Sequence, residues 1–202
     1  MYFNKSPQIL RSAISDAFWE IITNQKELYL TFDDGPHEVI TPLVLDILKK
    51  YQAKATFFCV GENILKNPTV FQRIINEGHQ VGNHTFSHNN GWKNNTTEYL
   101  RSYLKCQQLT KTSFFRPPYG RISPSQYQLI KKRSKVIMWS VLSGDFDSSN
   151  SVQDCVDNVF SGIKNGAIIV FHDSVKAENR VLNSLPLVLD ELSKKGFIFK
   201  SL

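Results

Sequence analysis

The sequence predicts an α/β protein whose parallel sheet is built from strand–helix units, and two observations lead to this prediction. Seven short strand-like runs alternate with helix-like segments along the 202 residues. Several runs, such as KATFFCV at 54–60, are almost wholly apolar, which is typical of strands buried on both faces of a sheet. A chain of this length favours a single domain. The alternation is compatible with a barrel and with an open sheet.

The first predicted strand begins at Leu28 in an alternating, aromatic-rich stretch. It stops at the breaker Gly35-Pro36, so that Asp33 and Asp34 stand at its end. A turn on Gly35 would let both carboxylates converge on one cavity, although aspartate also favours turns and helix caps. The remaining strands are expected at 54–60, 80–83, 113–115, 136–141, 167–171 and 197–199.

Helices are predicted between these strands by apolar residues at helical spacing. The expected ranges are 40–51, 62–77, 96–111, 123–133, 151–163 and 179–195. Pro42 and Pro124 fall in first turns, where proline is favoured, and Pro186 is expected in an early turn of the last helix. Gly78 and Gly196 follow predicted helix ends, as glycine commonly does.

The composition is that of an ordinary globular protein, with 41% hydrophobic and 21% charged residues. The 24 basic and 18 acidic residues give a net charge of +6, which permits contact with nucleic acid without specifying it. The one basic run, 131–133, lies near a predicted helix end, where cations suit the helix dipole. No basic tract with interleaved aromatic residues is found, so we expect no nucleic-acid partner.

The cysteines and the N-terminus restrict the cellular location. Cys59, Cys106 and Cys155 form no CxxC pair and are odd in number, so buried thiols are expected. Charged residues interrupt residues 1–26, which do not resemble a secretory signal, and no later stretch is long enough to span a membrane. These features indicate a cytoplasmic protein, with association with the cell envelope as the alternative.

Ionisable side chains stand at the ends of five predicted strands. They are Asp33 with Asp34, His84 with His88, Arg116, Asp145 and His172. The carboxyl ends of parallel strands open onto one rim, where active sites gather in both barrels and open sheets. We therefore expect these side chains to converge, and this convergence indicates an enzyme. Taken singly, each could be a turn residue, a surface ion pair or a core side chain.

The clearest metal signal is the pair His84 and His88. Residues four apart lie on one face of a helical turn, and Asp34 would complete a set of two histidines and one carboxylate with open positions. Such a set suits zinc, although other divalent metals would also bind. The alternative is a pair of capping or surface histidines.

Four motifs, TFDDGP, HTFSH, RPPYG and FHD, occur in this order and spacing. In these motifs the chain resembles the NodB-like polysaccharide deacetylases of carbohydrate esterase family four, over about residues 28–199. The resemblance implies a distorted (β/α) barrel of about seven strands and metal-dependent removal of acetyl groups from carbohydrates. It further implies a catalytic domain at 27–202, with residues 1–26 as an N-terminal extension packed on the barrel.

The resemblance also implies a role for each matching residue. Asp34, His84 and His88 match the metal ligands, with Zn²⁺ expected and Co²⁺ or Ni²⁺ as alternatives. Asp33 matches the general base and Arg116 the residue that orients it. The backbone N–H of Tyr119 matches an oxyanion donor, His172 matches the general acid, and Asp145 matches the partner of that histidine.

The chain departs from the family pattern around the acetyl group. Leu142 stands where the family has aspartate, Phe146 replaces tryptophan, and Val170 replaces the leucine two residues before the acid histidine. These changes alter the walls around the substrate rather than the groups that carry out the chemistry.

Together these residues predict a monomeric hydrolase that removes acetyl groups from N-acetylated sugars of the chitin-oligosaccharide or peptidoglycan type. The alternatives are an O-acetyl esterase acting on xylan, a non-catalytic carbohydrate-binding relative, and a different metal hydrolase such as a nuclease. Trp92, in a loop after the histidines, is either a platform for a sugar ring or a packing residue.

Overall fold

The computed structural model describes residue 14 and residues 16–202. Its strands are β1 (Glu27–Asp33), β2 (Thr56–Cys59), β3 (Gln80–Asn83), β4 (Phe114–Phe115), β5 (Lys135–Val136), β6 (Val141–Leu142), β7 (Ile168–His172) and β8 (Ile198–Lys200). The helices are α2 (Ile40–Lys50), α3 (Gly61–Lys66), α4 (Pro68–Asn76), α5 (Thr96–Thr110), α6 (Pro124–Ile130), α7 (Val152–Gly162) and α8 (Glu178–Lys194), with a short 3-10 turn η1 (Pro118–Gly120).

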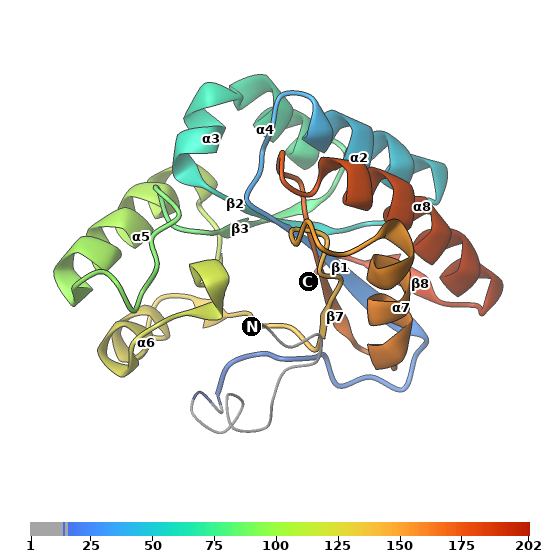
Figure 1. Cartoon of the computed structure of the whole chain (residues 1–202). Helices are drawn as coiled ribbons and strands as arrows, with labels where there is room; N and C mark the ends of the chain where they lie inside the picture. Colours follow the sequence, from blue (N-terminus) through green and yellow to red (C-terminus); the bar gives the residue numbers. More distant parts are fainter. Residues whose placement is uncertain (1–13, 15) are drawn as a thin grey trace.

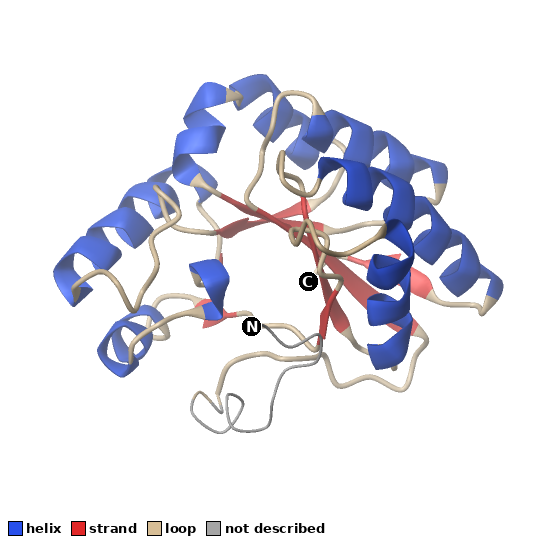
Figure 2. Ribbon diagram, viewed as in Figure 1, coloured by secondary structure: helices blue, strands red, loops and turns tan. Residues whose placement is uncertain are grey.

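All strands pair in parallel within one curled sheet. Their order is β5-β4-β3-β2-β1-β7-β6, and β8 pairs with the beginning of β1. The helices line the outside of the curl, and its two ends, β5 and β6, are not joined by a strand ladder within the described residues (Figures 1 and 2). This arrangement confirms the predicted α/β fold with a distorted barrel.

Strand β1 lies in the interior of the sheet, where it pairs with β2, β7 and β8, and all seven of its residues are buried. Its carboxyl end lies between two neighbours, because Asp33 is in register with Phe58 of β2 and with His172 of β7. The Phe32 ring stacks on Phe57 at 5.0 Å between centroids and on Phe171 at 6.0 Å. The buried aromatic side chains thus fix the register that places Asp33 beside His172.

The N-terminal segment crosses the open side of the barrel. Phe18 forms a bridge with Ile137, and Glu20 forms a bridge with Ala167 next to β7. Trp19 between them is 7% exposed and belongs to a core cluster. Residues 1–13 and 15 of the expected extension lie outside the described residues. Over the described part of the chain, no helix combines the length and the apolar character needed to cross a bilayer.

Three predicted elements differ from the structure. The helix expected at 62–77 is two helices that meet at Asn67, because Pro68 lacks an N–H and restricts the residue before it. The strand expected at 136–141 is divided into β5 and β6. Between them, the carbonyl groups of Ile137 and Met138 bind a buried arginine instead of a neighbouring strand. Pro186 lies in the interior of α8 rather than in an early turn.

Candidate active site

The two aspartates at the end of β1 both approach His84 because the backbone turns at Asp34. Asp33 is the last residue of the strand, and Asp34 has a φ of +83°, which a residue other than glycine rarely adopts. The expected turning residue, Gly35, has a different role. A Cβ on Gly35 would lie 2.0 Å from Oδ2 of Asp173, so glycine is needed there for close approach.

Asp34, His84 and His88 form a candidate metal site, in which the ligand atoms lie within 4.8 Å of one another. Oδ1 of Asp34 is 3.0 Å from Nε2 of His88 and 3.7 Å from Nε2 of His84. The expected helical turn is absent, because Thr85 and His88 have φ values of +62° and +50°. An irregular loop after β3 therefore brings the two imidazoles together.

The surroundings of His84 suit a metal ligand. Its Nδ1 lies 2.8 Å from the carbonyl oxygen of Arg116, and donation to that oxygen leaves Nε2 unprotonated and directed at Asp34. Burial lowers the pKa of His84 to about 4 despite the nearby carboxylates, so the imidazole is neutral at pH 7. A neutral imidazole and a carboxylate are ligands that zinc accepts. The residues therefore fit a divalent cation.

Arg116 is fully buried and holds Asp33 in place. Its Nη1 donates to Oδ1 of Asp33 and to Oγ1 of Thr31, at 2.7 Å in each case. Nη2 and Nε donate to the carbonyl oxygens of Met138 and Ile137 at 2.9 and 3.2 Å. A buried guanidinium with four protein acceptors has little freedom to move, so the orientation of the Asp33 carboxylate is fixed.

His172, the last residue of β7, forms a close pair with the buried Asp145. The Asp145 carboxylate accepts from Nδ1 of His172 at 2.8 Å and from the backbone N–H of the same residue at 2.7 Å. Burial disfavours the imidazolium, but the charge and hydrogen bond of Asp145 outweigh it and raise the pKa of His172 to about 9. The Phe146 ring packs edge-on against the imidazole, 5.0 Å between centroids. His172 is therefore protonated at neutral pH.

Tyr119 lies in the turn after β4, at the edge of the metal site. Its φ is +60°, and its ring lies 4.6 Å from the His88 ring between centroids. The structure therefore brings together the residues that the sequence assigned to catalysis and metal binding: the Asp34 group with Tyr119, the Asp33–Arg116 pair, and the Asp145–His172 pair, in which His172 ends the neighbouring strand β7.

Sequence reasoning missed Asp173, although the residue stands in the FHD motif. Asp173 is 1% exposed, and it accepts from the Gly35 N–H at 3.0 Å and from the Thr41 hydroxyl at 2.5 Å. Burial raises its pKa to about 7. The sequence signal that could have identified Asp173 is its position directly after a candidate catalytic histidine.

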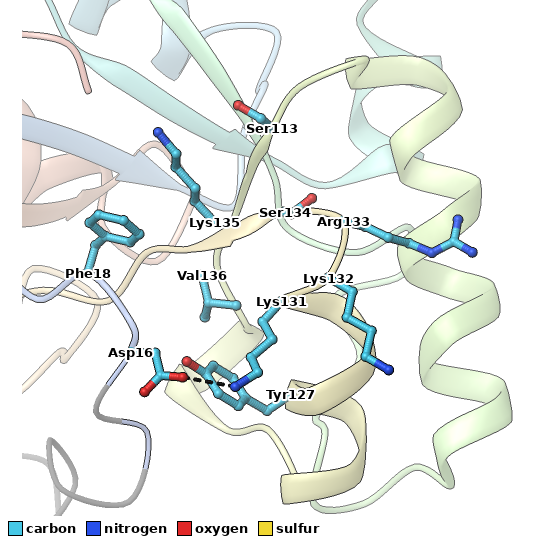
Figure 3. Close-up of a pocket in the computed structure, with 10 residues that line it drawn as sticks. All are labelled: Asp16, Phe18, Ser113, Tyr127, Lys131, Lys132, Arg133, Ser134, Lys135 and Val136. Atoms are coloured by element: carbon cyan, nitrogen blue, oxygen red, sulfur yellow. Dashed lines mark hydrogen bonds and ion pairs between the residues drawn. The ribbon is translucent and has the colours of Figure 1, made fainter.

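A surface cavity of about 490 Å³ lies at the amino-terminal ends of the strands, on the other side of the sheet from the candidate site (Figure 3). It is lined by Ser113 and Lys135, at the amino ends of β4 and β5, and by the basic run 131–133. Figure 3 shows the ion pair between Lys131 and Asp16, 2.9 Å long, with the Lys132 and Arg133 side chains pointing away from it. This cavity contains no group of histidines and carboxylates and is not the candidate site.

Fold and site together define an α/β-barrel protein with a candidate hydrolytic metal centre. The family described as polysaccharide deacetylase matches residues 20–134, more than half of the chain, and the chain belongs to this family. This confirms the resemblance seen in the sequence motifs.

Two curated relatives and one solved structure illustrate the similarity. A peptidoglycan-N-acetylglucosamine deacetylase of Bacillus cereus is 32% identical, over 90% of this chain and 88% of the relative. A chitooligosaccharide deacetylase of Azorhizobium caulinodans is 30% identical, over 90% of this chain and 95% of the relative. A crystal structure of a peptidoglycan N-acetylglucosamine deacetylase, in complex with 4-naphthalen-1-yl-N-oxidanyl-benzamide, superposes with a TM-score of 0.88 at 33% identity. It covers 95% of this chain and 94% of its own.

Proposed function

We propose that this protein hydrolyses the acetamide groups of N-acetylglucosamine units in a glycan, with the help of a bound divalent cation. The activities named for the relatives from Bacillus cereus and Azorhizobium caulinodans support this substrate class. One observation carries the mechanism. The fixed Asp33 carboxylate lies between a candidate metal site and a protonated histidine, with Nε2 of His84 4.0 Å from its Oδ2 and His172 opposite it in β7.

Asp34, His84 and His88 would hold the metal, and zinc suits this ligand set, with cobalt and nickel as alternatives. When bound, such a cation polarises a carbonyl group and lowers the pKa of water. The chain itself prepares the ligands, because the Arg116 carbonyl fixes the tautomer of His84 and burial keeps that imidazole neutral.

Asp33 is assigned the general base, which takes a proton from the attacking water. The Arg116 guanidinium occupies Oδ1 of Asp33 at 2.7 Å, so Oδ2 is the oxygen available to a water on the side of His84. Because Arg116 is fully buried and bound to four protein acceptors, it fixes this division between the two carboxylate oxygens.

The developing oxyanion is assigned to the backbone N–H of Tyr119, whose left-handed conformation fixes the direction of that group. His172 is assigned the general acid, which delivers its Nε2 proton to the leaving nitrogen. Asp145 holds Nδ1 at 2.8 Å and so directs the other ring nitrogen away from itself, toward the site.

Removal of an acetyl group from nitrogen requires a proton donor more than removal from oxygen does, because an amine anion is a poor leaving group. The raised pKa keeps His172 protonated at neutral pH, so it can supply this proton, and this favours N-deacetylation. Two substitutions favour the other activity. Leu142 and Val170 differ from the family pattern, and they are in register across β6 and β7, so together they change the wall expected to contact the acetyl group. O-deacetylation of xylan is therefore the second candidate function.

Mass spectrometry of N-acetylglucosamine oligomers and of acetylxylan, incubated in parallel, tests the proposal. We expect stepwise loss of acetyl groups from the oligomers, and a fall in that rate of about two to four orders of magnitude in the His172→Ala variant. Loss from xylan alone would favour the esterase. Absence of loss from both, with metal bound, would favour a non-catalytic relative.

We assign the catalytic domain to residues 27–202 and the N-terminal extension to residues 1–26. We expect a monomer, which light scattering coupled to size-exclusion chromatography tests. A cytoplasmic location, with envelope association as the alternative, is tested by fractionation of cells that produce the protein.

A further inference from the structure

One exposed aromatic residue near the site has no part in the proposed chemistry. Trp92 is 63% exposed, whereas Trp19 is 7% exposed and Trp139 packs against two buried clusters. The exposed indole presents a large apolar face to solvent, and tryptophan is enriched where such faces bind other molecules.

The loop that carries Trp92 is held rigidly. The buried Gln126 donates to the carbonyl oxygen of Gly91 at 2.9 Å, and the Gly91 N–H donates to the Arg121 carbonyl oxygen at 3.2 Å. A Cβ on Gly91 would lie 2.4 Å from that same oxygen. The indole N–H of Trp92 donates to the carbonyl oxygen of Ile122 at 3.3 Å. The polar atom of the indole is thus satisfied while the ring stays exposed.

The turn at residues 118–122 contacts both the candidate site and Trp92. The His88 and Tyr119 rings lie 4.6 Å apart between centroids, and Tyr119 is 60% exposed. Two residues further on, the Arg121 guanidinium lies 5.1 Å from the centroid of the Trp92 ring. This cation–π contact restrains the indole from one side. One turn therefore contacts a candidate metal ligand through Tyr119 and an exposed aromatic ring through Arg121.

We propose that Trp92 is the stacking platform for a further sugar ring of the substrate, beyond the one that is deacetylated. The inference rests on the proposed function and deepens it, because it assigns the protein to extended chains of N-acetylglucosamine. A β-linked pyranose presents axial C–H groups on its ring faces and hydroxyls at its rim. Such a ring can cover an indole while its hydroxyls remain hydrated.

Steady-state acetate release from a series of N-acetylglucosamine oligomers, from dimer to hexamer, tests this platform. In Trp92→Ala we expect KM for the hexamer to rise about tenfold, with kcat almost unchanged, and the effect to shrink toward the dimer. Trp92→Tyr, which keeps an aromatic face, should restore most of the hexamer affinity. Leu187→Ala, which removes an exposed apolar side chain from α8, is the matched control and should have no effect.

An equal change for all oligomers in Trp92→Ala, or no change, would overturn the platform while leaving the proposed function intact. A Trp92→Tyr variant as weak as Trp92→Ala would also overturn it. Absence of acetate release by the wild type would instead refute the proposed function, and with it this subsite, so the two failures are distinguishable.

Discussion

Asp33 and Asp34 are adjacent in the sequence but lie in different electrostatic surroundings. Asp33 is 4% exposed and is paired with a buried guanidinium. Asp34 faces two imidazoles. Burial opposes its ionisation, but the hydrogen bond with His88 and the charge of His172 hold the pKa of Asp34 well below its usual range. One carboxylate is thus positioned for proton transfer and the other for binding a cation.

This difference predicts opposite outcomes for two neighbouring substitutions. Asp33→Asn keeps the shape of the side chain but removes the base, so turnover should fall by about two to four orders of magnitude while metal content stays at the wild-type level. Asp34→Ala removes a ligand, so metal affinity should fall by at least about tenfold to a hundredfold. Elemental analysis and activity assays check both variants. An equal loss of metal from the two would contradict the assignment.

The Asp145–His172 pair predicts the pH dependence of the reaction. A general acid must be protonated, and the raised pKa of His172 keeps it so until the pH passes about 9, above which kcat/KM should fall. Asp145→Asn removes the charge that raises this pKa most and leaves burial to lower it, so the alkaline limb should move to lower pH than in the wild type. A pH–rate profile with an unmoved alkaline limb in Asp145→Asn would assign that limb to another group.

At the scale of secondary-structure elements, Asp173 connects three parts of the fold. It follows β7, accepts from the Gly35 N–H in the turn after β1, and accepts from Thr41 in the first turn of α2. Its own N–H donates to the carbonyl oxygen of Asp33 at 3.2 Å. These contacts hold the turn in which Asp34 adopts its unfavourable conformation.

Asp173→Ala should therefore weaken both stability and the metal site. It leaves two buried donors without their acceptor, which costs about 2–4 kcal/mol of unfolding free energy, and it frees the turn that positions Asp34. Urea unfolding and zinc titration measure the two effects. Thr41→Val removes the hydroxyl that donates to Asp173 and accepts from the His37 N–H, so it should also lower stability, by about 1–3 kcal/mol, but leave zinc affinity near the wild-type value. Wild-type zinc affinity in Asp173→Ala would show that the turn does not depend on this carboxylate.

Sequence patterns predicted those elements whose own side chains determine their structure. The apolar run in β2 and the helical spacing in α2 are local signals, and both elements were placed within two residues. The division of the predicted strand 136–141 is not local, because it depends on the Arg116 guanidinium, which arrives from β4 and takes the carbonyl groups of two strand residues. Distant contacts of this kind leave no periodic signal in the sequence.

The same distinction applies to the site. The residues were predictable because each lies at the end of a strand or in the loop after it, and the four motifs fix their order. The geometry of the site could not be predicted in the same way. His84 and His88 converge because two residues of their loop have left-handed backbone conformations, whereas a helical turn was expected there. The expected position of the turn after β1 was also off by one residue, at Gly35 instead of Asp34. The contact between Gly35 and Asp173 joins segments 138 residues apart.

In the whole molecule, the candidate metal ligands connect two separate stretches of the curled sheet. Asp34 belongs to the turn after β1, whereas His84 and His88 belong to the loop after β3, and β2 lies between these strands. A cation bound there would join both loops in the folded state only, since the unfolded chain does not hold the three ligands together. Metal binding should therefore stabilise the entire domain and not only support catalysis.

The thermal stability of the protein should accordingly depend on metal. At a free zinc concentration of about 100 times Kd, binding adds about 2.7 kcal/mol, which corresponds to a rise in Tm of roughly 5–10 °C for a domain of this size. A chelator should lower Tm to the metal-free value and abolish acetate release, and zinc or cobalt should restore both. The matched control is Asp34→Ala, in which added zinc should leave Tm almost unchanged. Full activity of protein shown to be metal-free by elemental analysis, or an equal rise in Tm in Asp34→Ala, would place the metal elsewhere or remove it from the reaction.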